Sequence, residues 1–146
     1  QIDLYGNINS TMLGEDYARP KKRFPGSGGA NEVASFCWKT IVIMMQERRR
    51  FVPRVDFDSS PGYLDGTPGA RERAGLPAGT GPWRVVTSKA VFGFDAATKK
   101  MTLLGVLEGL RPQDVIDDMD FTPLVAPGME ALPAPTLREL VNRLTR

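Results

Sequence analysis

The segment of the sequence with the clearest chemical potential is a glycine-rich turn that consists of Gly26, Ser27, Gly28, Gly29, Ala30 and Asn31. Glycine accepts positive φ values and lets a ligand approach the backbone closely, so such a turn can direct backbone N–H groups at an anion. Residues 31–38 carry apolar side chains at helical spacing, and a helix N-terminus adds positive potential. The pattern favours an oxyanion or phosphate site. A purely structural turn is the alternative, because the dinucleotide fingerprint and the P-loop pattern are both absent.

A second polar turn follows Ile2 and Leu4, whose alternation indicates the end of a strand. In open α/β sheets, the loops that contact a ligand lie where strands end. The candidate substrate-binding residues of this turn are therefore Asn7, Asn9 and Ser10. Asparagine and serine also commonly bond to their own backbone in turns, and this alternative stays open.

Several charged residues carry a weaker signal. Arg71, Glu72 and Arg73 could pair with one another or with an anion, although solvated charge is the simpler expectation. The net charge of +2 is too small to indicate nucleic acid as a partner, and the basic clusters at 21–23 and 48–50 are not interleaved with aromatic residues. A small anionic molecule fits this composition better.

The absence of histidine excludes a Ser-His-Asp triad, a Cys-His dyad and a histidine-ligated zinc site from this chain, and we expect no metal. Carboxylates, lysine and backbone amides remain, which favours acyl chemistry.

The single cysteine, Cys37, cannot form an internal disulfide, and we expect it to be a small buried residue. The longest apolar run, 40–45, is far shorter than the roughly 20 residues of a membrane span, so we expect a cytoplasmic protein.

The pattern of elements predicts a single α/β domain over residues 1–146. The β-branched run 40–46 is typical of a central strand buried on both faces, and residues 84–87, 90–95 and 101–107 predict three further strands, the last two as an antiparallel hairpin. Pro112 begins a predicted helix, and the capping box of Thr136 and Glu139 opens a C-terminal one with Leu137, Leu140, Val141 and Leu144 on its apolar face. Two connections are expected, a long loop at 58–82 and a surface linker at 123–135.

Six stretches, taken together in their order and spacing, resemble the β subunit of family I coenzyme A-transferases, of the glutaconate CoA-transferase type. They are QIDLYGNINST at 1–11, RFPGSGGANEVAS at 23–35, TIVIMMQERRRFV at 40–52, SSPGYLDG at 59–66, RERAGLP at 71–77 and VVTSKAVFGFD at 85–95. The resemblance covers nearly the whole chain apart from its C-terminal tail.

The resemblance implies an open, mostly parallel sheet flanked by helices, with a C-terminal hairpin and helix. It implies that the chain is the C-terminal part of such a β subunit and is catalytically incomplete alone. The expected partners are a CoA-transferase α subunit, the N-terminal part of the same β subunit and acyl-CoA, in a hetero-oligomer without nucleic acid or membrane. No cofactor is expected, and coenzyme A enters as a moiety of the substrate.

The resemblance also implies a mechanism. In the family, a glutamate attacks the thioester and carries first the acyl group and then CoA. This glutamate belongs to the N-terminal part of the β subunit, so we expect no catalytic side chain in this chain. We therefore do not assign the role to Glu32. The backbone of Gly28 and Gly29 would stabilise the oxyanion, and the rest of the turn would bind substrate. Relatives with a replaced carboxylate leave an alternative open: a decarboxylase of the glutaconyl-CoA type or a hydrolase on the same scaffold.

Overall fold

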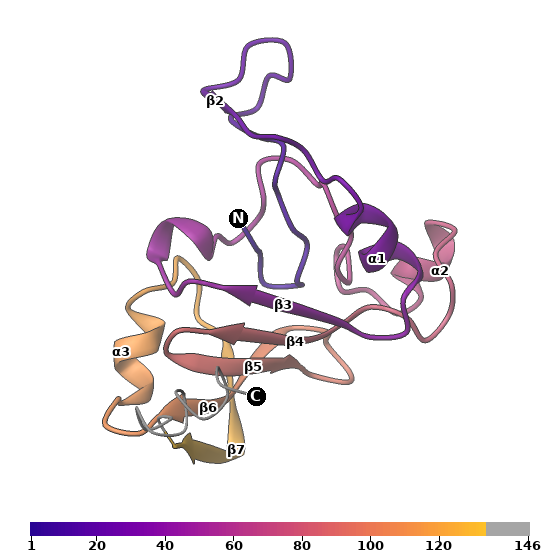
Figure 1. Ribbon diagram of the computed structural model, residues 1–146. Helices are drawn as coiled ribbons and strands as arrows, with labels where there is room; N and C mark the ends of the chain where they lie inside the picture. The colour runs from indigo at the N-terminus through magenta and orange to yellow at the C-terminus, as the bar shows by residue number, and fades with distance from the viewer. Residues whose placement is uncertain (134–146) are drawn as a thin grey trace, which may run out of the picture.

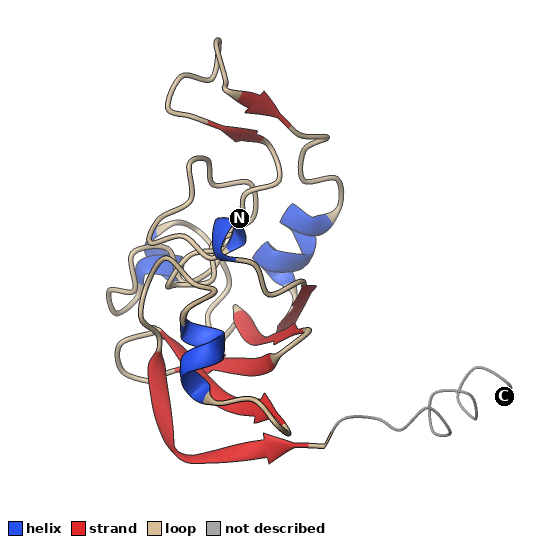
Figure 2. Ribbon diagram, turned by 90° about the vertical axis from the view of Figure 1, so that its left-hand side faces the viewer, coloured by secondary structure: helices blue, strands red, loops and turns tan. Residues whose placement is uncertain are grey.

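The computed structural model describes residues 1–133, so the helix predicted from Thr136 lies outside the described residues (Figures 1 and 2). A five-stranded sheet with the order β3-β4-β5-β6-β7 forms the centre, and a two-stranded arm projects from it at the top of Figure 1. The elements are β1 Met12–Leu13, β2 Lys22–Arg23, α1 Ala30–Phe36, β3 Thr40–Met44, η1 Arg48–Arg50, α2 Ala70–Arg73, β4 Pro82–Thr87, β5 Ala90–Phe94, β6 Met101–Leu107, α3 Pro112–Ile116 and β7 Leu124–Leu132.

The sheet confirms the α/β class and the predicted hairpin, but its strands are mixed rather than mostly parallel. β3 and β4 run parallel, as do β6 and β7, whereas β4, β5 and β6 form antiparallel neighbours. The reason is the length of the connections. Only Ser88 and Lys89 separate β4 from β5, and a connection this short can join antiparallel strands only, because a parallel crossover needs a dozen residues or more.

One face of the sheet carries the core. Val42, Val85, Phe92 and Leu103 lie in register across β3 to β6 and pack on this face. It is covered by Ile2, by Val115 of α3 and by Phe51, whose ring centroid lies 5.8 Å from that of Phe92. We call this the inner face. Within residues 1–133, no helix has the length and apolar character that crossing a bilayer requires.

The prediction of a central strand at 40–46 was wrong. β3 lies at one edge of the sheet, and its side chains alternate between the inner face and solvent: Ile41 and Ile43 are 53% and 81% exposed, and Met45 beyond the strand is also exposed. An unbroken apolar run predicts burial on both faces. In the described part of the chain, only one face of β3 is covered and only β4 pairs with it.

Three other expectations also differ from the structure. The predicted linker at 123–135 contains the nine-residue strand β7, which the pattern hid because Pro127 and Gly128 interrupt it. An edge strand tolerates both residues, since one side of its backbone needs no partner. The predicted strand tail at the N-terminus forms only isolated bridges through Ile2. Cys37 is exposed rather than buried, because it follows α1 on the way to β3.

Candidate active-site loop

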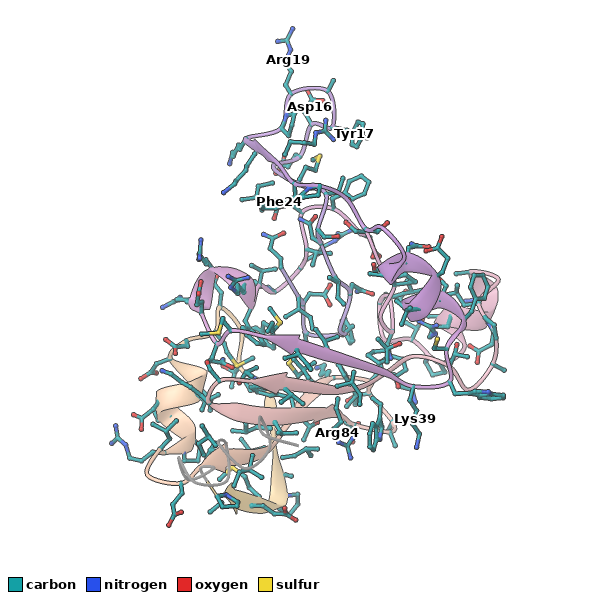
Figure 3. The ribbon with its side chains drawn as sticks, viewed as in Figure 1. Asp16, Tyr17, Arg19, Phe24, Lys39 and Arg84 are labelled. Atoms are coloured by element: carbon teal, nitrogen blue, oxygen red, sulfur yellow. The ribbon has the colours of Figure 1, made fainter. Side chains whose placement is uncertain are left out.

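The glycine-rich turn lies between the arm and α1, and the backbone closes it tightly. The Gly26 N–H donates to the Ser10 carbonyl at 2.9 Å, and the Ala30 N–H donates to the Ser27 carbonyl at 3.0 Å. Gly28 has a φ of +50°, a left-handed conformation that favours glycine. The helix predicted at 31–38 is confirmed as α1, which begins directly after Gly29. In Figure 3, Phe24 marks the base of the arm, two residues before the turn begins.

The backbone of Gly28 and Gly29 is open to solvent. Both residues are exposed, and within residues 1–133 their N–H groups donate to no acceptor. A Cβ placed on either residue would meet no atom within 4 Å. Two adjacent exposed backbone donors that no protein acceptor uses can bind an oxygen anion without a charged side chain.

Ser59 holds this turn in place, although no sequence pattern assigns it a role. Its hydroxyl accepts the Ser10 N–H at 3.0 Å and bonds to the Thr11 hydroxyl at 2.6 Å. Its carbonyl accepts the Asn31 side-chain amide at 2.9 Å. Ser59 therefore connects both predicted turns, bringing Ser10 and Asn31 together beside the glycines. Nothing local marks a serine as such a hub, because its partners lie 28 to 49 residues away in the chain.

Asn7 and Asn9 are bonded to residues outside the glycine turn. Both are buried, and every amide group of both side chains is used within the chain. The partners of Asn7 are the Asp3 carboxylate, the Leu64 carbonyl, the Gly62 N–H and the Leu64 N–H. Those of Asn9 are the Gln1 side-chain oxygen, the Met12 carbonyl, the Thr11 N–H and the Met12 N–H. This arrangement fits the alternative noted for turn asparagines, which stabilise their own loops.

Arg71 corrects the expectation of a solvated charge. The residue is 4% exposed, and its guanidinium donates to the carbonyls of Ala34 and Ser35 at 2.9 and 3.1 Å and to that of Gly62 at 2.6 Å. Ala34 and Ser35 belong to the last turn of α1, where carbonyls lack helical partners and a cation is favourable. Burial lowers the pKa of Arg71. Arg71 therefore ties the end of α1 to the loop that begins at Ser59.

The sequence profile described as "Coenzyme A transferase" matches residues 1–118. The chain belongs to the coenzyme A transferase family. It is 46% identical to the β subunit of glutaconate CoA-transferase from Acidaminococcus fermentans, over 97% of the chain and 53% of that protein. It is 34% identical to the β subunit of 3-oxoadipate CoA-transferase from Pseudomonas knackmussii, over 96% of the chain and again 53% of the relative. The chain thus spans about half the length of the curated relatives it matches.

A solved structure supports the same assignment. The fold superposes on glutaconate coenzyme A-transferase from Acidaminococcus fermentans with a TM-score of 0.85 and 44% sequence identity. The match covers the whole of this chain and 54% of that one. The mixed sheet of this CoA-transferase family member therefore matches the fold of that solved structure.

A cavity of about 1030 Å³ lies beside residues 53–58 in this CoA-transferase family chain. Asp3, Asn7, Asp58 and Lys21 are among its lining residues. Burial and the neighbouring Asp3 carboxylate raise the pKa of Asp58 to about 6, and burial raises the pKa of Asp3. Within residues 1–133, no set of acidic or cysteine side chains is arranged to hold a metal ion. Asp58, which lines this cavity, directly precedes Ser59 in the chain.

Proposed function

We propose that this chain is the C-terminal part of the β subunit of a heteromeric enzyme that transfers CoA between acyl-CoA thioesters and carboxylic or dicarboxylic acids such as glutaconate. The observation that carries the proposal is the 46% identity to the β subunit of glutaconate CoA-transferase over 97% of the chain. The geometry adds a chemical reason, since two exposed backbone donors at Gly28 and Gly29 suit the oxyanion of acyl transfer.

In this proposal the chain supplies electrostatic stabilisation and the nucleophile comes from elsewhere. A glutamate of the N-terminal part attacks the thioester carbonyl, CoA thiolate leaves, and an acyl-glutamyl anhydride forms. The thiolate then attacks the glutamyl carbonyl, which releases the carboxylic acid and leaves a glutamyl-CoA thioester. The Gly28 and Gly29 N–H groups would donate to the carbonyl oxygen while it carries negative charge.

The partners follow from the same proposal. An α subunit and the N-terminal part of the same β subunit complete the enzyme, in the cytoplasm, with acyl-CoA as substrate and no further cofactor. The turn residues Ser27 and Asn31, with Ser10 beside them, line the approach to the two glycines. Asn7 and Asn9 would serve the substrate only indirectly, by holding the loops at residues 9–12 and 62–64 in place.

Transfer is favoured over the decarboxylase and hydrolase alternatives because both curated relatives carry transferase names. The discriminating experiment is denaturing mass spectrometry of the purified complex, with peptide sequencing of each polypeptide that accompanies this chain. After incubation with acyl-CoA and no acceptor, we expect a glutamate of an accompanying polypeptide to gain the mass of CoA less one water. Release of CO2 or free acid without this adduct would support the alternatives instead.

A further inference from the structure

The two basic clusters of the chain differ in how their charges are balanced. In the cluster at 48–50, which forms η1, all three arginines form salt bridges with Glu47 or Asp120. The other cluster lies on the arm, which consists of β1, β2 and the loop between them. Within residues 1–133, neither Lys22 nor Arg23 of the arm takes part in a salt bridge. Of the two clusters, the arm therefore presents cations that no carboxylate neutralises.

These cations are exposed on a thin projection of the molecule. Lys22 and Arg23 are exposed, as is Arg19, which Figure 3 shows at the outer end of the arm. Residues 12–23 carry four basic side chains against two acidic ones, so the net charge of the arm is +2 and equals that of the whole chain. Like charges that lie close together repel one another, and a bound polyanion relieves this repulsion.

Aromatic rings lie beside these cations in the folded chain. The Arg23 guanidinium lies 4.3 Å from the ring centroid of Tyr17 and donates to the Tyr17 carbonyl at 2.7 Å. The Lys22 ammonium lies 5.6 Å from the ring centroid of Phe24. Tyr17 is 58% exposed, and its ring also contacts that of Phe57, with 5.6 Å between the centroids. An exposed ring beside free cations is typical of a nucleotide site, because the ring stacks on a base while the cations pair with phosphate.

The arm leads directly into the glycine turn. The pairing of β1 with β2 continues towards the turn, since the Phe24 N–H donates to the Thr11 carbonyl at 2.8 Å. Gly28 follows Arg23 by five residues, so the backbone between them spans at most roughly 17 Å. The pantetheine chain that joins the thioester of acyl-CoA to its ADP is about as long as an extended peptide of four residues. An acyl-CoA whose thioester lies at the turn can therefore reach the arm with its nucleotide.

We propose that the arm binds the ADP end of acyl-CoA, which carries a further phosphate on its ribose. Tyr17 stacks on the adenine, and Lys22 and Arg23 pair with the phosphates, while the thioester lies at Gly28 and Gly29. The inference rests on the proposed function, because it takes acyl-CoA as the substrate. A single nucleotide fits the arm better than a nucleic acid does, since the cations of the other basic cluster are already paired.

The first test compares glutaconyl-CoA with glutaconyl-pantetheine, which has the same thioester and lacks the nucleotide. In the assembled enzyme, with acetate as the acceptor, the measured quantity is the ratio of kcat/KM for the CoA thioester to kcat/KM for the pantetheine thioester. The double variant Lys22→Gln, Arg23→Gln should lower this ratio by about tenfold or more, because two charge-assisted contacts with phosphate are lost. A ratio within one preparation cancels differences in the amount of folded enzyme.

The second test measures binding of free CoA to the assembled enzyme by calorimetry and needs no transfer. The double variant at Lys22 and Arg23 should raise the Kd by about tenfold or more. Tyr17→Ala should raise it by about fivefold or more, whereas Tyr17→Phe, which keeps the ring, should bind as the wild type does. Arg49→Gln removes a charge that is paired with Glu47, so it should leave both the ratio and the Kd unchanged.

Three outcomes would overturn the inference. They are an unchanged ratio and Kd in the double variant, an equal loss with both thioesters, and dissociation of the variant complex in size-exclusion chromatography, which would make the arm a contact between subunits. Arm-dependent binding of CoA in a complex without transferase activity would count against the proposed function and leave the inference intact. Full transfer with an unchanged ratio would do the reverse.

Discussion

The glycine turn and the polar framework behind it use their hydrogen-bonding groups in opposite ways. At Gly28 and Gly29, backbone donors are exposed and unused within the described chain. Behind the turn, Arg71 and Asn7 are buried and bonded to carbonyls and amides of distant loops. Burial of a polar group is costly unless its partners are present, whereas an exposed donor costs little to leave free.

The difference separates the residues that should determine activity from those that should determine stability. A substitution in the turn removes donors that only a ligand uses. A substitution in the framework leaves buried groups without partners and destabilises the fold. Four substitutions test this division, and each is paired with a control at a residue of the same type or charge.

The largest expected effect is at Gly29. Gly29→Val in the assembled enzyme should lower kcat by roughly 100- to 1000-fold, as removal of one oxyanion donor does, because the new side chain occupies the open space beside the proposed oxyanion site. The Tm should stay unchanged, since a Cβ at this position has free space and φ is −76°. Gly128→Val on β7, where the space is equally open, should retain full activity. Full activity of Gly29→Val would remove the turn from the mechanism.

Arg71→Met should destabilise the fold by about 3 kcal/mol, because it strips charged donors from buried carbonyls at the end of α1. Urea denaturation of the same assembly measures the change. The neighbouring Arg73, whose bonds to Pro68 and Thr67 are exposed, provides the control. If Arg73→Met destabilised the fold as much as Arg71→Met, the buried hydrogen bonds of Arg71 would not be the source of the stability.

Ser59→Ala should cost about 1 to 2 kcal/mol, since the Ser10 N–H and the Thr11 hydroxyl lose their shared partner. Because the turn is then held less firmly, kcat should also fall several-fold. The adjacent Ser60 is a matched control, as its buried hydroxyl has no partner within residues 1–133. Ser60→Ala should be neutral or slightly stabilising, and equal losses in both variants would argue against a specific role for Ser59.

The smallest effect concerns pH. The folded chain holds the proton of Asp58 up to its pKa of about 6, whereas the unfolded chain loses it near 3.8. Between these values the folded state binds more protons, so ionisation of Asp58 lowers stability as the pH rises towards 6. Asp58→Asn should flatten this part of the profile of Tm against pH. It should add at most on the order of 1 kcal/mol at neutral pH, because Asp58 is exposed to solvent and its interactions are screened.

The control for this prediction is Glu108→Gln, which alters an exposed carboxylate after β6. Its profile of Tm against pH should follow that of the wild-type chain. A fall in stability between pH 4 and 6 that persists in Asp58→Asn would assign the effect to other groups, with Asp3 the nearest one to test.

The local features of this protein were predictable from its sequence, because each depends on residues close together in the chain. The glycine turn before a helix, the hairpin of β5 and β6 and the helix that begins at Pro112 all lie where the pattern indicates. The family was also predictable, since six stretches in the same order carry it. Turn chemistry and hydrophobic period act over a few residues, and at these elements no tertiary contact overrode them.

Tertiary structure decided which groups are free and which are used. The apolar run 40–46 predicts a central strand, yet its place in the sheet depends on which partners cover it. The sequence around Arg71 predicts a solvated charge, yet carbonyls 36 and 37 residues away surround it. Ser59 and Asn7 owe their roles to partners as much as 49 and 57 residues distant. The sequence by itself thus determined the turn and the helix after it, whereas long-range pairing, which no local pattern encodes, determined which residues hold the turn in place.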